Sequence, residues 1–260
     1  MNEQTISILG CGWLGKPLAE HFIKNRRKIN GTTTNPTKID SLNDLKINSF
    51  VIDINKRNND FKSFLKANLL VISIPSKNIE DFKYLISEIE KSTIKKIIFI
   101  SSTSVYPLNN SITTEDSPIH KTALSKIEQL FRVNTNFKTT IIRFGGLIGY
   151  DRKPGRFFKK EIIIDRPKGY INLIHRDDCI QIINRIITNN IWEETLNACA
   201  DSHPTRRDFY TREFLKEGRK IPVFNESSTN SYKIINSDRL KLLLNYSFKY
   251  ANLMKYKQLN

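Results

Sequence analysis

The sequence predicts an α/β protein built on a doubly wound parallel sheet, followed by a smaller carboxy-terminal lobe. Short apolar runs of strand type alternate with stretches of helical spacing along the first 150 residues. Two of these runs, residues 69–72 within the segment 68–74 and residues 97–100, are continuously apolar, which is typical of strands buried on both faces. Because successive strands joined through helices need crossover connections, they form a parallel sheet with helices on both faces.

The first strand and the first helix enclose a glycine-rich turn. Residues 6–9 form an apolar run, residues 10–15 read GCGWLG, and apolar residues recur at helical spacing over 18–23. A G-x-G-x-x-G turn between a strand and a helix is typical of a dinucleotide site, because the pyrophosphate binds at the amino end of the helix. The alternative is a glycine turn with a purely structural role. We expect the pyrophosphate to contact Gly10, Gly12, Trp13, Leu14 and Gly15.

We expect each glycine of this turn to have a different structural role. Gly10 permits the tight turn, Gly12 lacks the Cβ that would strike the phosphates, and Gly15 lets the helix pack against its strand. Such a sheet with this turn is called Rossmann-type.

The composition predicts a globular protein that works in the cytoplasm. Hydrophobic residues make up 39% of the 260 residues, and the three cysteines are too few and too irregularly spaced for a disulfide framework or a metal site. We expect no leader peptide and no membrane-spanning segment, since no apolar run is long enough. The net charge of +16 would suit a polyanion, but its basic residues are scattered, so nucleic-acid binding is not favoured.

The second strand, at residues 28–34, bears on the choice of cofactor. A site that prefers NAD carries an Asp or Glu about 20 residues beyond the glycines, where it binds the ribose. Here that place is taken by Thr33 and Thr34, with Arg26, Arg27 and Lys38 near in sequence. The sequence therefore favours NADP over NAD, with the two threonines on the adenosine ribose. Alternatively these hydroxyls cap the next helix, as Thr37 could.

The next strands bring further groups to the same sheet edge. Residues 50–53 are predicted to form the third strand, which places Asp53 near the adenine. The strand at 68–74 ends in Ile74 and Pro75, where the chain leaves the sheet on the side expected to face the cofactor. The strand at 97–100 opens into Ser101–Tyr106, a run of hydroxyls expected beside the nicotinamide.

Four segments in order carry a resemblance to a known family: GCGWLG at 10–15, SSTSVY at 101–106, IIRFGGLIG at 141–149 and INLIHRDD at 171–178. Together they resemble the extended and atypical short-chain dehydrogenase/reductase family, also called NAD-dependent epimerase/dehydratase-like proteins. The similarity continues through LNACAD at 196–201 and PTRRDFY at 204–210. It implies a dinucleotide-binding domain at 1–150 and a substrate lobe at 151–260, interleaved with the sheet.

The resemblance also implies catalytic residues. The family's catalytic Ser or Thr corresponds to Ser102, which would bind the substrate carbonyl or hydroxyl. Its alternative role is to satisfy local backbone at the end of the strand. The family's acid/base is the Tyr of a Tyr-x-x-x-Lys pair, and none of the nine tyrosines here has a Lys four positions later. His120 stands where the Tyr is expected and Leu124 where the Lys is expected, so His120 is the candidate acid/base unless it is only a loop residue.

Three other positions are expected to be structural. We interpret Tyr106 as a packed aromatic, His175 as a structural histidine before a helix, and Thr205 as the start of the following helix.

Two functions follow as alternatives. One is an NAD(P)-dependent oxidoreductase or epimerase-like enzyme that acts on a small or sugar-like hydroxyl or carbonyl compound. The other is a non-catalytic NAD(P)-binding redox sensor or regulatory module, which the missing Tyr-Lys pair favours. We expect no metal and no membrane partner, and we expect that the protein can form a homodimer.

Overall fold

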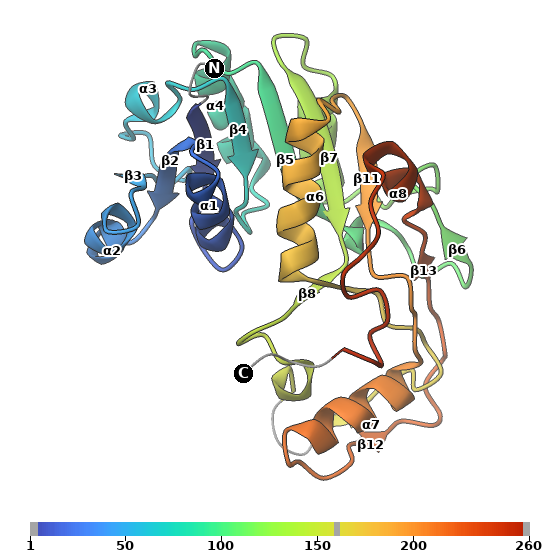
Figure 1. Cartoon of the computed structure of the whole chain (residues 1–260). Helices are drawn as coiled ribbons and strands as arrows, with labels where there is room; N and C mark the ends of the chain where they lie inside the picture. Colours follow the sequence, from blue (N-terminus) through green and yellow to red (C-terminus); the bar gives the residue numbers. More distant parts are fainter. Residues whose placement is uncertain (1–4, 159–161, 257–260) are drawn as a thin grey trace. The chain divides into compact units, whose positions relative to one another are not determined.

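The computed structural model describes residues 5–158 and 162–256 (Figure 1). The chain folds into two compact units. The first unit contains residues up to 101 together with 121–142 and 186–195, and the second contains 102–120, 143–185 and the residues from 196 onward. Segments 102–120 and 143–150, which the sequence analysis placed in the first domain, therefore belong to the second unit. Residues 186–195 belong to the first.

The elements of the first unit alternate between strands and helices. In order they are β1 (Thr5–Leu9), α1 (Gly15–Lys24), β2 (Lys28–Thr33), η1 (Pro36–Lys38), α2 (Ile39–Asn43), β3 (Asn48–Val51), α3 (Phe61–Phe64), β4 (Leu69–Ile72), α4 (Ile79–Glu90), β5 (Lys96–Ser102), α5 (Ala123–Arg132) and β7 (Lys138–Phe144). The last residues of β5 and β7 continue into the second unit.

The second unit has short strands and three longer helices. Its elements are η2 (Thr103–Val105), β6 (Ile112–Thr113), β8 (Gly146–Ile148), η3 (Pro154–Arg156), β9 (Ile163–Ile164), β10 (Leu173–His175), α6 (Arg176–Thr188), β11 (Thr195–Ala198), α7 (Arg206–Lys216), β12 (Val223–Phe224), β13 (Ile234–Ile235) and α8 (Asp238–Leu244). Three two-stranded parallel ladders join β10 to β8, β12 to β9 and β13 to β6.

The central sheet has seven strands in the order β11-β7-β5-β4-β1-β2-β3. Neighbouring strands from β5 to β3 pair in parallel, with Ile6 opposite Ile29 on one side and Leu69 on the other. From β1 the chain builds β2 and β3 on one side and then β4, β5 and β7 on the other, so the strand order reverses beside β1. This arrangement confirms the predicted doubly wound sheet and places the glycine turn at the reversal point, where such sheets bind ligands.

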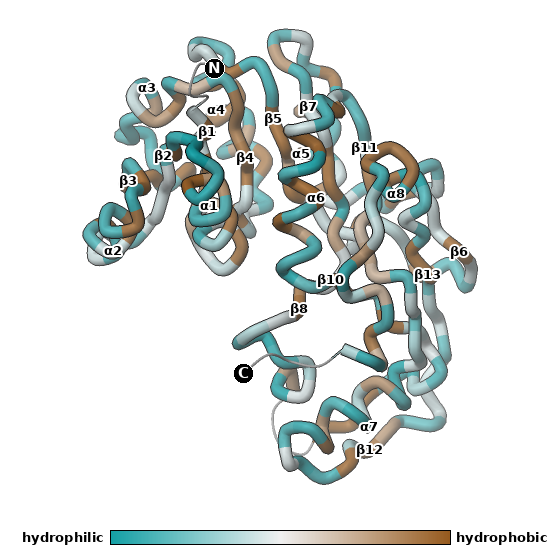
Figure 2. The backbone as a smooth tube through the Cα atoms, in the orientation of Figure 1, coloured by the Kyte–Doolittle hydropathy of each residue, from teal (hydrophilic) through white to brown (hydrophobic). Residues whose placement is uncertain are grey.

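Apolar side chains bury the sheet of the first unit. All four residues of β4 are buried, as its continuous apolar run predicts, and Figure 2 shows hydrophobic colouring along this strand. Phe99 of β5 stacks on Phe131 of α5 at 5.0 Å between ring centroids, and Phe82 of α4 meets both rings edge-on. Within the described residues, no helix is both long and apolar enough to cross a membrane.

The second unit has its own core, centred on α7 and the ladders beside it. Phe209, Tyr210 and Phe214 of α7 are buried there together with Ile148 and Leu253. Thr205 begins this helix as predicted, because its hydroxyl accepts the N–H of Asp208 at 3.1 Å.

Several predicted boundaries differ from the observed ones. The third strand ends at Val51, so Asp53 lies two residues beyond it. Thr37 does not cap the next helix; Asn35 accepts its N–H at 3.0 Å within η1. Shortly after Phe144, Gly146 is the first residue of β8 and pairs with Leu173.

Candidate nucleotide site and the turn after β5

The glycine turn leaves β1 and enters α1 within six residues. The N–H of Gly10 donates to Thr32 Oγ1 at 2.8 Å, and the N–H of Cys11 donates to Thr32 O at 2.7 Å. Ser73 N–H binds Leu9 O at 2.8 Å on the other side. The turn is therefore tied to β2 and to the end of β4, which brings Gly10, Ser73 and Ile74 together.

The fold requires two of the three glycines. Gly10 has a φ of +97°, and a Cβ there would lie 2.6 Å from Ser73 O and 2.7 Å from Ile74 Cγ2. A Cβ on Gly15 would lie 2.1 Å from Gly10 O. Both positions are closed to any larger residue, since backbone atoms cannot move aside.

Gly12 is different, because the protein itself does not require a glycine there. A Cβ at Gly12 would meet no atom within 4 Å, and its backbone is not in the left-handed region. The missing Cβ therefore leaves space on the open side of the turn for a group that is not part of the chain.

The amino end of α1 offers free donors beside that space. Among the described residues, neither the N–H of Gly12 nor that of Leu14 has a hydrogen-bond partner. No side chain caps the helix and no acidic residue lies in its first turn. Unpaired N–H groups and the positive end of the helix dipole together suit an anion such as a pyrophosphate. The residues therefore fit the phosphate groups of a dinucleotide.

Thr32 and Cys11 are residues of this site that the sequence analysis did not single out. Thr32 is 1% exposed and holds two consecutive N–H groups of the turn. The Cys11 thiol packs where a Cβ on Gly31 would lie, and burial raises its pKa to about 12, so it is a packing residue rather than a nucleophile. No local signal in the sequence indicates Thr32, because the pairing of β1 with β2 brings it beside Gly10.

The predicted ribose residues lie just beyond β2. Thr33 Oγ1 accepts the N–H of Asn35 at 3.1 Å, so this hydroxyl already takes part in a local turn. Thr34 is exposed. No carboxylate follows β2 before Asp40.

Asp53 and Pro75 lie in loops of the same unit. Asp53 Oδ1 accepts the N–H of Asn55 at 3.1 Å, and Asn59 bonds to its backbone on both sides. The Asp53 loop is therefore held in shape by Asn59. Pro75 is exposed just after β4.

The hydroxyl side chains at the end of β5 have two different roles. Ser101 is buried and donates to Glu128 Oε1 of α5 at 2.5 Å. Ser102 begins η2, and its oxygen accepts the N–H of Ser104 at 3.1 Å. The local backbone role considered for Ser102 is thus present, and its hydroxyl proton remains available for another acceptor.

His120 and Leu124 lie near the start of α5. His120 is exposed, and its N–H donates to Val105 O at 2.8 Å. Thr122 caps α5 in a reciprocal capping box with Ser125, and Leu124 is buried. The position of the family lysine therefore carries a packing side chain.

Tyr106 lies in a buried network. Arg143 Nη1 donates to Tyr106 Oη at 2.6 Å, and Tyr106 Oη donates to Asn197 Oδ1 at 2.8 Å. Burial raises the pKa of Tyr106. With a 2% exposed side chain and both hydrogen-bond directions used, Tyr106 is a packed aromatic.

His175 also has a structural environment. Its ring lies against Gly149, is 3.8 Å from the ring of Tyr250 between centroids, and accepts the N–H of Asp177 at Nδ1, 3.1 Å away. Burial lowers the pKa of His175 to about 4, so the ring is neutral at pH 7.

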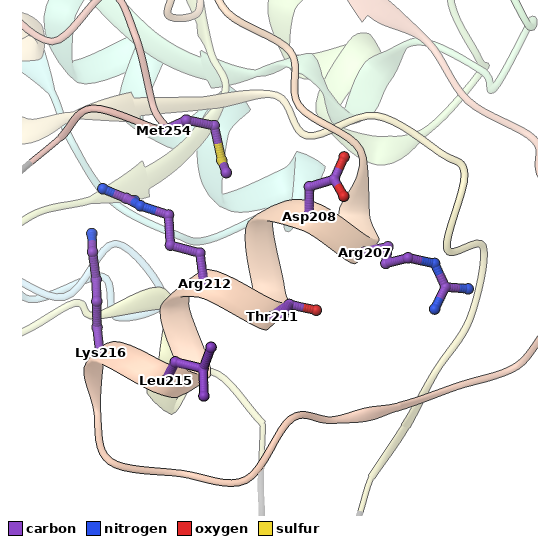
Figure 3. A pocket seen from close by; sticks show the side chains of 7 residues that line it. All are labelled: Arg207, Asp208, Thr211, Arg212, Leu215, Lys216 and Met254. Carbon is purple, nitrogen blue, oxygen red and sulfur yellow. The ribbon is translucent and has the colours of Figure 1, made fainter.

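A shallow hollow of about 880 Å³ lies along α7 (Figure 3). Its cations are already engaged, because Arg212 and Lys216 both donate to Glu213 Oε1 and to Tyr256 O, and Arg207 pairs with Glu226. We assign no site to it.

The chain was compared with protein-family models, curated proteins and solved structures. No protein-family model matches the chain. Protein YeeZ of Escherichia coli (strain K12) is 27% identical over 265 residues, which cover 95% of this chain and 96% of that protein.

Two solved structures show the same fold. A short-chain dehydrogenase/reductase superfamily protein from Agrobacterium tumefaciens with bound NAD has a TM-score of 0.77 at 14% identity, and the match covers 96% of this chain and 94% of that one. UDP-glucuronic acid 4-epimerase from Bacillus cereus, in complex with UDP-glucuronic acid and NAD, has a TM-score of 0.78 at 20% identity and covers 96% and 95%. The predicted resemblance is confirmed at the level of the fold.

Proposed function

We propose that this chain, which has the Rossmann-type fold of the short-chain dehydrogenase/reductase superfamily, is an NAD(P)-dependent oxidoreductase or epimerase-like enzyme of the extended or atypical type. The observation that carries the proposal is the turn after β1. Its outer glycines are required by the chain, whereas Gly12 leaves open space beside unpaired N–H groups. A nicotinamide dinucleotide supplies hydride transfer when bound.

In this proposal, different residues of the first unit bind different parts of the dinucleotide. Gly12 and Leu14 would donate their N–H groups to the pyrophosphate, and Thr33 and Thr34 would lie at the adenosine ribose. Asp53 lies at the adenine, and Ile74 and Pro75 line the edge after β4. Support comes from the shared attachment of the turn to β2 and β4 through Thr32 and Ser73.

We propose NADP as the preferred cofactor, with NAD as the alternative. The 2′-phosphate of NADP would carry negative charge next to the loop after β2, where an acidic residue would repel it. Thr34 and Asn35 stand in that loop and carry no charge.

The substrate is proposed to be a small or sugar-like hydroxyl or carbonyl compound. The Bacillus cereus epimerase of the same fold binds UDP-glucuronic acid, which supports a sugar-like substrate. Ser102 would donate its hydroxyl proton to the substrate oxygen. His120 remains the proposed acid/base, because no Tyr-x-x-x-Lys pair is present and Leu124 packs in the lysine position.

A second candidate function is a non-catalytic NAD(P)-binding sensor. The specific observation in its favour is that the lysine position of the catalytic pair carries the buried Leu124. Both candidates include cofactor binding, so turnover distinguishes them. We further propose a homodimer and a reducing compartment such as the cytoplasm, the latter because Cys11, Cys179 and Cys199 are all free.

The first test measures cofactor binding through the fluorescence of the tryptophan in the turn. The chain has two tryptophans, and Trp192→Phe leaves Trp13 in the glycine turn as the reporter. Titration of this variant with NADPH and with NADH should quench its fluorescence saturably, with tighter binding of NADPH. If neither nucleotide quenches Trp13 or binds by calorimetry, both candidate functions are wrong.

The second test separates the enzyme from the sensor. NADPH-loaded protein is incubated with a panel of carbonyl compounds and nucleotide sugars, and nicotinamide absorbance and sugar products are followed. Turnover supports the enzyme, whereas binding without any turnover supports the sensor.

A further inference from the structure

Lys233 reaches the turn that carries Ser102. Its Nζ donates to Thr103 O at 2.7 Å and to Tyr106 O at 2.6 Å. These carbonyls belong to η2 and to the residue that ends it, and Ser102 begins the same short helix. A residue 127 to 130 positions away in sequence thus holds both ends of the turn.

The ammonium group of Lys233 keeps one donor free. An ammonium carries three N–H groups, and two of them are used by the carbonyls. Among the described residues, the structure gives the third no hydrogen-bond partner, and no carboxylate lies within ion-pair distance of Nζ.

A second cation adds to this charge. Burial lowers the pKa of Lys233, and the positive charge of Arg166 lowers it further. Within the described part of the chain, Arg166 has no carboxylate partner either, and the residue is partly buried. Two neighbouring cations that lack a counter-ion create a positive potential that an anion can neutralise.

The segment that carries Lys233 is held on both sides. Asn172 donates to Lys233 O at 2.9 Å and accepts the N–H of Ile235 at 2.9 Å. Tyr232 N–H donates to Asn110 Oδ1 at 2.8 Å, and β13 pairs with β6 directly after it. The backbone of Lys233 is therefore fixed, so the charge has a defined place before any ligand binds.

We propose that Lys233, assisted by Arg166, forms an anion-binding subsite beside the Ser102 turn, where it binds a phosphate or carboxylate oxygen of the substrate. The shared chemistry is a singly bonded anionic oxygen that accepts the free N–H of the ammonium group. The statement that this anion belongs to the substrate rests on the proposed function. The subsite itself does not, because a simple anion can test it.

The test measures how bound anions protect the Lys233 amine from acetylation. The full chain reacts with N-acetoxysuccinimide, a neutral reagent, and peptide mass spectrometry follows Lys233 and the exposed Lys255 of the same unit separately. Inorganic phosphate and acetate are titrated, each against sodium chloride at matched ionic strength. Phosphate should slow the acetylation of Lys233 saturably and leave Lys255 at its chloride rate.

Variants of Arg166 supply the matched control. In Arg166→Met the phosphate concentration for half protection should rise about tenfold, the loss expected for one charge-assisted interaction, while Arg166→Lys should recover most of it. Protection by acetate as well would extend the subsite to carboxylates, and protection by phosphate alone would restrict it to phosphates. Equal rates in phosphate and chloride would overturn the proposal, whether or not NADPH binds the glycine turn.

Discussion

Gly10 and Gly12 are both glycines of the turn, but for different physical reasons. Gly10 is needed by the chain, because any Cβ there would strike Ser73 O at 2.6 Å. Gly12 faces open space, so the fold does not require a glycine there, and we propose that the requirement comes from a ligand. The sequence predicts these two different parts, and the structure adds the contacts that exclude a Cβ at Gly10.

The loop after β2 provides a test of cofactor preference at a single side chain. Thr34→Asp places a carboxylate where the 2′-phosphate is proposed to lie. The Kd for NADPH should rise about tenfold through like-charge repulsion, and the Kd for NADH should change little. The neutral Thr34→Asn serves as the control. An unchanged ratio of the two Kd values would place the 2′-phosphate elsewhere.

Ser102 provides a second test at the residue scale. Once a substrate is found, Ser102→Ala should lower kcat about 100-fold, because the substrate oxygen loses its proton donor. Ser102→Thr should retain most activity, and the Kd for NADPH should stay the same in both. Full kcat in the alanine variant would leave Ser102 only its observed role at the start of η2.

Some site residues could not be read from the sequence because distant segments bring them together. Thr32 lies beside Gly10 through the pairing of β1 with β2, which is 22 positions away. Lys233 donates a hydrogen bond to Thr103 O, although the two residues are 130 positions apart in the sequence. No local spacing signals such a contact, whereas the resemblance of the segment at 101–106 to the family's motif implies Ser102 directly.

At the scale of elements, length and periodicity decided what could be predicted. β4 and β5 carry apolar runs and were placed to within a few residues. The ladders β12 with β9 and β13 with β6 have two residues a strand, too few for a periodic signal. Their pairing depends on tertiary packing instead.

The start of α5 gives a stability prediction for an element. Thr122 accepts the N–H of Ser125 at 3.2 Å and Ser125 accepts the N–H of Thr122 at 2.9 Å, which satisfies two donors at once. Thr122→Ala should lower the free energy of unfolding by about 1 kcal/mol in urea denaturation. Thr34→Ala, on an exposed loop of the same unit, is the control. Equal effects of the two changes would show that the capping box contributes nothing.

At the scale of the whole molecule, the stability should fall in mild acid. The pKa of His175 is lowered by burial from 6.5 to about 4, so between these values the unfolded chain binds a proton that the folded chain excludes. Stability is therefore complete above about pH 7 and decreases as the pH falls towards 4, by about 2–3 kcal/mol for this group. Burial lowers the pKa of His203 as well, which adds in the same direction.

The measurement is urea unfolding of the wild type and of His175→Asn across this pH range. The variant should be less stable at pH 7, because Asn leaves space beside Gly149 and Tyr250, but its stability should depend less steeply on pH. Parallel curves for the two proteins would mean that His175 titrates alike in the folded and unfolded chains.

The central claim is that the turn after β1 binds the pyrophosphate of a nicotinamide dinucleotide, and Gly12→Val tests it most directly. The valine side chain would enter the space left by Gly12, so calorimetric titration should detect no binding of NADPH or NADH, while the unfolding temperature stays within about 2 °C of the wild type. Gly10→Ala should instead lower the unfolding temperature, because its Cβ strikes Ser73. Wild-type affinity for either nucleotide in a folded Gly12→Val protein would contradict the claim.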